Sequence, residues 1–125
     1  MKKRIATQAA PAAIGPYSQA VVAGNYVFVS GQLGINPQSG VLEEGIEAQT
    51  NRVFNNLQSI LKEAGLTFDD IIKTTVFIAD INDFSLVNKI YSEYIKGEIL
   101  PARSCVQVAE LPKKALIEIE VIAGA

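Results

Sequence analysis

The strands that this sequence predicts outnumber the helices that could cover them. Two segments have the 3.6-residue apolar repeat of an amphipathic helix, whereas five have the β-branched and aromatic composition of strands. Two helices can cover only one face of a sheet. The sequence therefore predicts a two-layer α+β domain, with two helices on one face of a mixed sheet.

Each predicted helix is marked by apolar residues at helical spacing and by a glycine near its end. The first is expected to begin at about Ile46 and to end at Gly65. The second is expected to be capped by Asp80 or Asn82 and to end at Gly97. The apolar positions are Val53, Leu57, Ile60, Leu61 and Ala64 in the first helix, and Phe84, Val87, Ile90, Tyr91 and Tyr94 in the second.

The predicted order of elements is strand, strand, helix, strand, helix, strand, strand. The first two strands form a hairpin around residues 23–25, where Gly24 or Asn25 supplies the unusual backbone angles of the turn. Several strands are apolar on both faces, as where Val27 and Val29 alternate with Phe28. An uncovered apolar face implies self-association. The predicted strands are residues 18–22, 26–30, 74–78, 103–108 and 116–122.

Composition limits the partners of the chain. Its 125 residues are enough for one domain, residues 1–125, and 49% of them are hydrophobic, which is typical of a globular protein. The net charge of −2 and the lack of a basic helix face argue against nucleic acid as the main partner. No apolar run approaches the roughly 20 residues of a membrane span, and none resembles a secretory signal. We therefore expect a cytoplasmic protein that does not bind membranes.

The chain has no histidine and one cysteine. A zinc site of the usual His/Cys kind is therefore not available, nor is a Ser-His or Cys-His nucleophile pair. Any general base must come from the Asp, Glu, Tyr or Lys side chains.

Arg103 is the most informative single residue. On a strand it shares one face with Cys105 and Gln107. A guanidinium is costly to bury without an anion. That anion is either Glu118 or Glu120 of the same chain, or the carboxylate of a substrate, to which the planar fork of arginine is well suited.

The other candidate residues also have a structural interpretation beside a functional one. Cys105 could be a nucleophile whose pKa Arg103 lowers, but a lone cysteine on a strand is usually small, buried and inert. Glu118 and Glu120 are either solvated charges or, near Arg103, a general base that positions water. The sequence alone does not rank these two carboxylates.

Three further positions could border a pocket. Tyr17 is more often a packing residue with its hydroxyl in water. The pair Ser30-Gly31 ends a strand with a residue that lets a ligand approach the backbone closely. Asn88 lies on the second helix, where it is usually solvated or caps the backbone.

Five separated motifs resemble the RidA/YjgF family, whose older names are endoribonuclease L-PSP and translation-initiation inhibitor. The resemblance runs essentially from end to end, and the motifs occur in the same order. They are residues 10–19 (APAAIGPYSQ), 28–32 (FVSGQ), 73–77 (KTTVF), 101–106 (PARSCV) and 117–120 (IEIE).

The resemblance implies a chorismate-mutase-like fold and a homotrimer with active sites in clefts between subunits. It implies hydrolysis of reactive 2-imino or enamino acids, such as 2-iminopropanoate and 2-iminobutanoate, to 2-oxo acids and ammonia, without a metal or cofactor. The segment 95–100 differs among relatives and leaves the preferred imine side chain open. The alternatives are an endoribonuclease, or a non-enzymatic trimer that binds metabolites in a regulatory or chaperone-like role.

Matching the motifs residue by residue also implies roles for single side chains. Arg103 resembles the carboxylate clamp, and Glu118, rather than Glu120, resembles the carboxylate that activates water. Cys105 is expected to contact substrate through its backbone. The implied pocket residues are Tyr17, Ser30, Gly31, Asn88 and Cys105.

Overall fold

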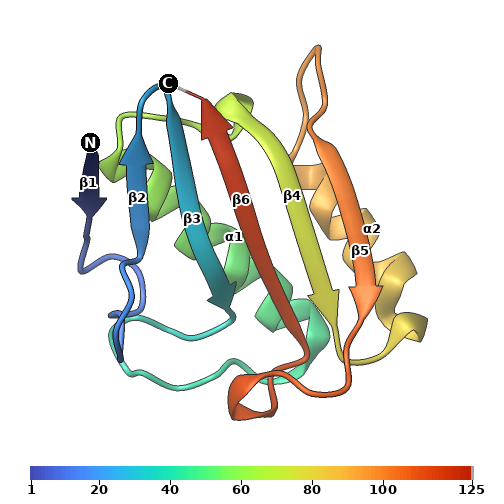
Figure 1. Cartoon of the computed structure of the whole chain (residues 1–125). Helices are drawn as coiled ribbons and strands as arrows, with labels where there is room; N and C mark the ends of the chain where they lie inside the picture. Colours follow the sequence, from blue (N-terminus) through green and yellow to red (C-terminus); the bar gives the residue numbers. More distant parts are fainter. Residues whose placement is uncertain (125) are drawn as a thin grey trace.

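Two helices lie side by side on one face of a single sheet (Figure 1). The computed structural model describes residues 1–124, in which the strand order is β1-β2-β3-β6-β4-β5. The β4–β5 pair is parallel and the other neighbours are antiparallel, so the predicted mixed, two-layer α+β architecture is confirmed. The strands are β1 (Lys2–Ile5), β2 (Ala20–Ala23), β3 (Tyr26–Leu33), β4 (Ile71–Ile78), β5 (Ala102–Gln107) and β6 (Ile117–Gly124).

The first helix, α1 (Gly45–Glu63), ends where the sequence predicts. Gly65 has a left-handed φ of 78°, which glycine adopts without steric cost. The N–H of Gly65 donates to the carbonyl of Lys62, and the N–H of Leu66 donates to the carbonyl of Leu61 at 2.8 Å. This paired arrangement is a Schellman motif, and it satisfies the last carbonyls of the helix.

The second helix, α2 (Phe84–Tyr94), ends before Gly97 is reached, so that predicted boundary is wrong. Ile95 leaves the helical conformation, with φ −96° and ψ 94°, and its side chain is buried in the core. Burial of this apolar side chain ends the helix, and Gly97 belongs to the loop that follows. At the other end, Asp80 accepts a hydrogen bond from the backbone of Asn82 and caps a short 3₁₀ turn rather than α2 itself.

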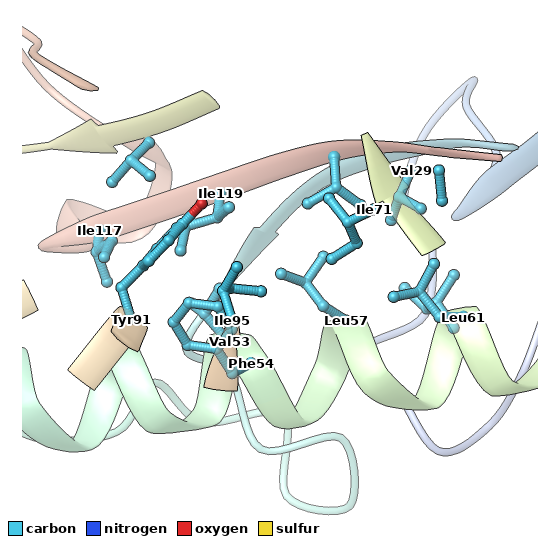
Figure 2. Packing of buried hydrophobic residues seen from close by; sticks show 14 of the residues in the cluster. Val29, Val53, Phe54, Leu57, Leu61, Ile71, Tyr91, Ile95, Ile117 and Ile119 are labelled. Atoms are coloured by element: carbon cyan, nitrogen blue, oxygen red, sulfur yellow. The ribbon is translucent and has the colours of Figure 1, made fainter. Parts of the chain in front are cut away.

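The core lies between the helices and the sheet (Figure 2). Phe54 and Leu57 of α1 are fully buried and point toward β6. Burying each such side chain contributes about 1.5–3 kcal/mol. On the sheet side, Ile117, Ile119 and Val121 alternate with exposed or half-buried residues. No helix within residues 1–124 has the length and apolarity needed to cross a membrane.

Helix α1 packs directly on the end of β3 because Gly34 has no side chain. A Cβ at Gly34 would lie 2.6 Å from the Cα of Gln49, which leaves no room for any other residue. The buried amide of Gln49 donates to the carbonyl of Glu43 and accepts from the N–H of Leu116 at 2.8 Å. These contacts fix the start of β6, and therefore Glu118, relative to the helix layer.

The other face of the sheet is open in the single chain (Figure 1). Four large apolar side chains lie on it about half exposed: Tyr26 (50%), Phe28 (46%), Ile72 (45%) and Val106 (46%). The predicted uncovered apolar face is thus confirmed. Such a surface is typical of a face that associates with another protein.

The N-terminal region differs from the prediction in two places. The strand β1 was not predicted, because Lys2-Lys3-Arg4 has no apolar alternation, yet it pairs with β2 at the edge of the sheet. Ser18 was expected in a strand but precedes β2. Its carbonyl instead accepts a hydrogen bond from the Ser30 hydroxyl at 2.6 Å.

Candidate active site

The predicted site residues lie in two groups on opposite faces of the sheet. Arg103, Asn88 and Cys105, here called the arginine group, lie on the helix face. Glu118 alternates with buried core residues of β6 and therefore points to the open face. Together with Tyr17, Ser30 and Gly31, it lines a cavity and forms what we call the glutamate group.

Arg103 is held in place by α2. Its Nη1 donates to Asn88 Oδ1 at 2.7 Å. Its guanidinium lies 4.7 Å from the ring centre of Tyr91 and 5.5 Å from that of Phe84. The Tyr91 hydroxyl shares a 2.8 Å hydrogen bond with Thr74 in the sheet, which fixes the ring. Stacking and hydrogen bonding thus orient the guanidinium before any ligand binds.

Within residues 1–124, Arg103 has no carboxylate partner. In the described part of the chain, the ion pair that forms joins Arg52 to Glu43. The expected alternative of an internal pair with Glu118 or Glu120 is therefore not observed. Asn88 occupies one of the five guanidinium donors, so others remain available to an anion from outside the chain.

The environment of Cys105 disfavours a thiolate. Burial raises the pKa of the Cys105 thiol, and the nearby charge of Arg103 lowers it by a smaller amount. A nucleophilic cysteine needs the opposite balance, with its pKa reduced toward neutrality. Arg103 therefore lowers the pKa of Cys105 as predicted, but the opposing effect of burial is larger.

Glu118 packs directly over Gly31. A Cβ at Gly31 would lie 2.7 Å from the Glu118 carboxyl carbon, so this close approach requires glycine. Burial raises the pKa of the Glu118 carboxyl, and the charge of Glu120 raises it further. A carboxylate with a raised pKa accepts a proton more readily, which suits a general base.

The glutamate group opens onto a cavity of about 690 Å³. Tyr17 is 54% exposed at its wall, and the Ser30 hydroxyl is tied to the carbonyl of Ser18. Gly31 and Glu118 line the cavity beside them. Much of the remaining wall is apolar and consists of Pro11, Ala12, Ile14, Leu33, Ile35, Pro37 and Pro112.

Sequence reasoning missed the residue that shapes one wall of this cavity. Gln19 is 4% exposed, and its amide nitrogen lies within hydrogen-bonding distance of the carbonyls of Thr7, Ala10 and Pro11. Its carbonyl oxygen accepts from the N–H of Thr7 at 2.7 Å. One buried amide therefore folds the segment that carries Tyr17. A glutamine at the start of a strand gave no periodic signal of this role.

A second buried amide holds the opposite wall. Asn56 of α1 is 1% exposed, and its Nδ2 donates to the carbonyls of Leu33 and Ile35 at 3.1 and 3.0 Å. Among the described residues, its Oδ1 has no hydrogen-bond partner. Asn56 lies on the buried, mostly apolar face of α1. The helical repeat could therefore show only that a polar residue stands at an apolar position, and not which groups it binds.

A larger cavity, of about 910 Å³, lies at the ends of the two helices, between Lys62, Phe68, Tyr94 and Lys96. The larger cavity is lined by none of the predicted site residues. The 690 Å³ cavity, which the glutamate group lines, is therefore the better candidate for the active site. Within residues 1–124, no three His, Cys, Asp or Glu side chains are grouped as a metal site.

The fold and site together define a class: a two-layer α+β domain with a preoriented arginine on one face and a shielded carboxylate on the other. The profile of the family described as Endoribonuclease L-PSP matches residues 7–125. The chain is 49% identical to the 2-iminobutanoate/2-iminopropanoate deaminase of Escherichia coli K12 over 125 residues, covering 98% of each chain. The chain therefore belongs to the RidA/YjgF family, as its motifs predicted.

Solved structures agree with this assignment. A Rid-family protein from Yersinia pestis, YyfA, superposes with a TM-score of 0.97 at 54% identity and covers 100% of both chains. Escherichia coli TdcF, solved with bound serine, has a TM-score of 0.92 at 46% identity, covering 98% of each chain.

Proposed function

We propose that this protein is a deaminase that hydrolyses 2-imino acids, and their enamine forms, to 2-oxo acids and ammonia. The observation that carries the proposal is the Arg103 fork, which is stacked, bound to Asn88 and not paired with any carboxylate in the described part of the chain. A planar fork in this state suits the carboxylate of a small substrate. The names of the relatives support this substrate class, as does the serine bound to TdcF, which carries the same carboxylate.

The active site of this enzyme is shared between copies of the chain. Arg103 lies on the helix face and Glu118 on the open face, so one substrate cannot meet both residues of the same chain. A contact that joins the arginine group of one copy to the glutamate group of the next is heterologous, and repeated contacts of this kind form a ring where the rotation between copies closes. The family resemblance implies that the ring has three copies. The half-exposed apolar side chains of the open face provide a surface for this association.

In the shared cleft, Arg103 binds the substrate carboxylate and places the imine carbon. Glu118 of the neighbouring copy accepts a proton from a water molecule, whose oxygen attacks that carbon. Glu118 returns that proton to the nitrogen of the tetrahedral adduct. The C–N bond then breaks as the adduct hydroxyl loses its proton to Glu118, which leaves the 2-oxo acid and ammonia. Tyr17, Ser30 and Gly31 line the pocket with Glu118. The backbone of Cys105 contacts the substrate beside Arg103.

This chemistry needs no metal or cofactor, because the protonated imine is already electrophilic. Dehydratases acting on serine and threonine generate 2-iminopropanoate and 2-iminobutanoate, and we place the protein with them in the cytoplasm.

The test is to generate the imine in situ with a threonine dehydratase and to follow its loss and the release of ammonia. The protein should accelerate both, and Arg103→Ala should abolish the acceleration while remaining folded. Absence of any acceleration by the folded wild-type protein would contradict the proposal. RNA cleavage measured in parallel, if retained by Arg103→Ala, would favour the endoribonuclease named in the family description instead.

A further inference from the structure

The turn that precedes β6 places two lysines in an unusual backbone conformation. Lys113 and Lys114 have φ values of 58° and 56°, in the left-handed region that glycine and asparagine normally occupy. The buried side chains of Leu111 and Ala115 anchor the turn on either side. The surrounding structure therefore imposes this conformation, and strained residues of this kind tend to lie at ligand sites.

The two lysines differ in what they face. Lys113 lines the 690 Å³ cavity together with Glu118, whereas Lys114 does not. Among the described residues that line this cavity, Lys113 is the one cation. It forms no ion pair within residues 1–124. An unpaired ammonium group at the wall of a binding cavity is a recognition element for an anion.

The cavity also exceeds the needs of the smallest substrate. 2-Iminopropanoate has six non-hydrogen atoms, which at no more than about 30 Å³ each occupy roughly 180 Å³. The hollow that one chain contributes to the cleft has a volume of about 690 Å³. A substrate with a longer side chain therefore has room between the reacting carbon and the cavity wall.

We propose that Lys113 recognises a second carboxylate on the substrate side chain, so that the cleft accepts 2-imino dicarboxylic acids as well as monocarboxylic ones. This inference rests on the proposed function. Arg103 binds the carboxylate next to the imine, and Lys113 binds the distal one. The reaction is unchanged: water adds to the imine carbon, the C–N bond breaks, and 2-iminobutanedioate gives 2-oxobutanedioate and ammonia.

The experiment compares two imines made in situ by amino-acid oxidases, 2-iminopropanoate from alanine and 2-iminobutanedioate from aspartate. Lys113→Met keeps the length of the side chain and removes its charge. It should lower kcat/KM for the dicarboxylic imine by roughly tenfold or more, because a charge-assisted contact is lost. The value for 2-iminopropanoate should fall by less than about threefold at physiological ionic strength, where remote charges are screened.

Lys114→Met is the matched control, since it removes the same charge from the same kind of turn residue outside the cavity. It should leave the ratio of the two kcat/KM values unchanged, and Lys113→Arg should restore most of the wild-type ratio. An equal change of the ratio in both Met variants, or no change in either, would overturn the inference. If the wild-type protein hydrolyses only 2-iminopropanoate, the proposed role of Lys113 is refuted but the proposed function stands. If it hydrolyses neither imine, the proposed function is refuted.

Discussion

Replacing Arg103 with lysine isolates the geometry of the guanidinium from its charge. Lysine keeps one positive charge at this position but has no planar fork. It cannot reproduce both the 2.7 Å hydrogen bond to Asn88 Oδ1 and the stacking over Tyr91 at 4.7 Å. The variant therefore retains electrostatic attraction for a carboxylate and loses its orientation.

The expected loss follows from these contacts. A hydrogen bond to a charged group contributes about 1.5–3 kcal/mol. Loss of one substrate contact of this kind lowers kcat/KM roughly 10- to 150-fold. The effect on folding should be smaller, about 0.5–1 kcal/mol, because Arg103 is exposed and its cation–π contacts lie at the surface.

The assay is the imine reaction, with kcat and KM measured separately and stability followed by thermal unfolding. Arg52→Lys is the matched control: Arg52 is also hydrogen-bonded, to Glu43 at 2.9 Å, but lies outside both site groups. It should keep near wild-type kcat/KM. Near-normal turnover in a folded Arg103→Lys variant would refute the reasoning, because Arg103 would then be a structural residue.

Three further predictions concern the carboxylate and the thiol. The charge of Glu120 raises the pKa of Glu118, so Glu120→Gln should lower that pKa and move the acidic limb of the pH–rate profile to lower pH, with the plateau rate retained. Glu118→Gln should instead lose the plateau rate itself. If the two variants behave the other way round, Glu120 is the base. Gly31→Ala places a Cβ 2.7 Å from the Glu118 carboxyl carbon, so kcat should fall at least roughly tenfold. The melting temperature should change little, because only the end of the flexible Glu118 side chain must move. An unaltered kcat would show that the position of Glu118 is unimportant. Cys105→Ala should keep most of the activity, because burial keeps the thiol protonated, and a covalent adduct seen by mass spectrometry together with an inactive variant would contradict this.

Local patterns predicted the elements and the faces of single strands. The helical repeat located α1 and α2, and strand alternation grouped Arg103 with Cys105 on one face of their strand and Glu118 with Glu120 on one face of theirs. These predictions depend on the spacing of residues along the chain, which is independent of tertiary contacts.

The remaining features depend on contacts between distant segments. Alternation within single strands could not show that Arg103 meets Asn88 of α2 rather than a carboxylate. The Glu118 and Glu120 side chains of β6 point to the open face, whereas α2 covers the other face of the sheet. The approach of Glu118 to Gly31 depends on the pairing of β3 with β6. The folding of the N-terminal segment by Gln19 likewise requires hydrogen bonds to residues up to 12 positions away.

The most direct test of the shared cleft is to mix two variants that are each inactive. Arg103→Ala lacks the carboxylate clamp, and Glu118→Gln lacks the base. Co-expression of the two chains in equal amounts produces mixed assemblies. In these, a cleft can receive its wild-type arginine from one chain and its wild-type glutamate from the other.

If the two chains assemble at random, a cleft receives a wild-type Arg103 in half of the cases and, independently, a wild-type Glu118 in half of the cases. About one quarter of the clefts in a ring of identical contacts should therefore contain both. A shared cleft predicts recovery of roughly one quarter of the wild-type kcat per cleft in the mixture, and no recovery when the separately purified variants are mixed without subunit exchange. Failure to recover activity in mixed assemblies that native mass spectrometry shows to have formed would contradict the shared cleft, because each chain would then have to supply both Arg103 and Glu118 to its own site.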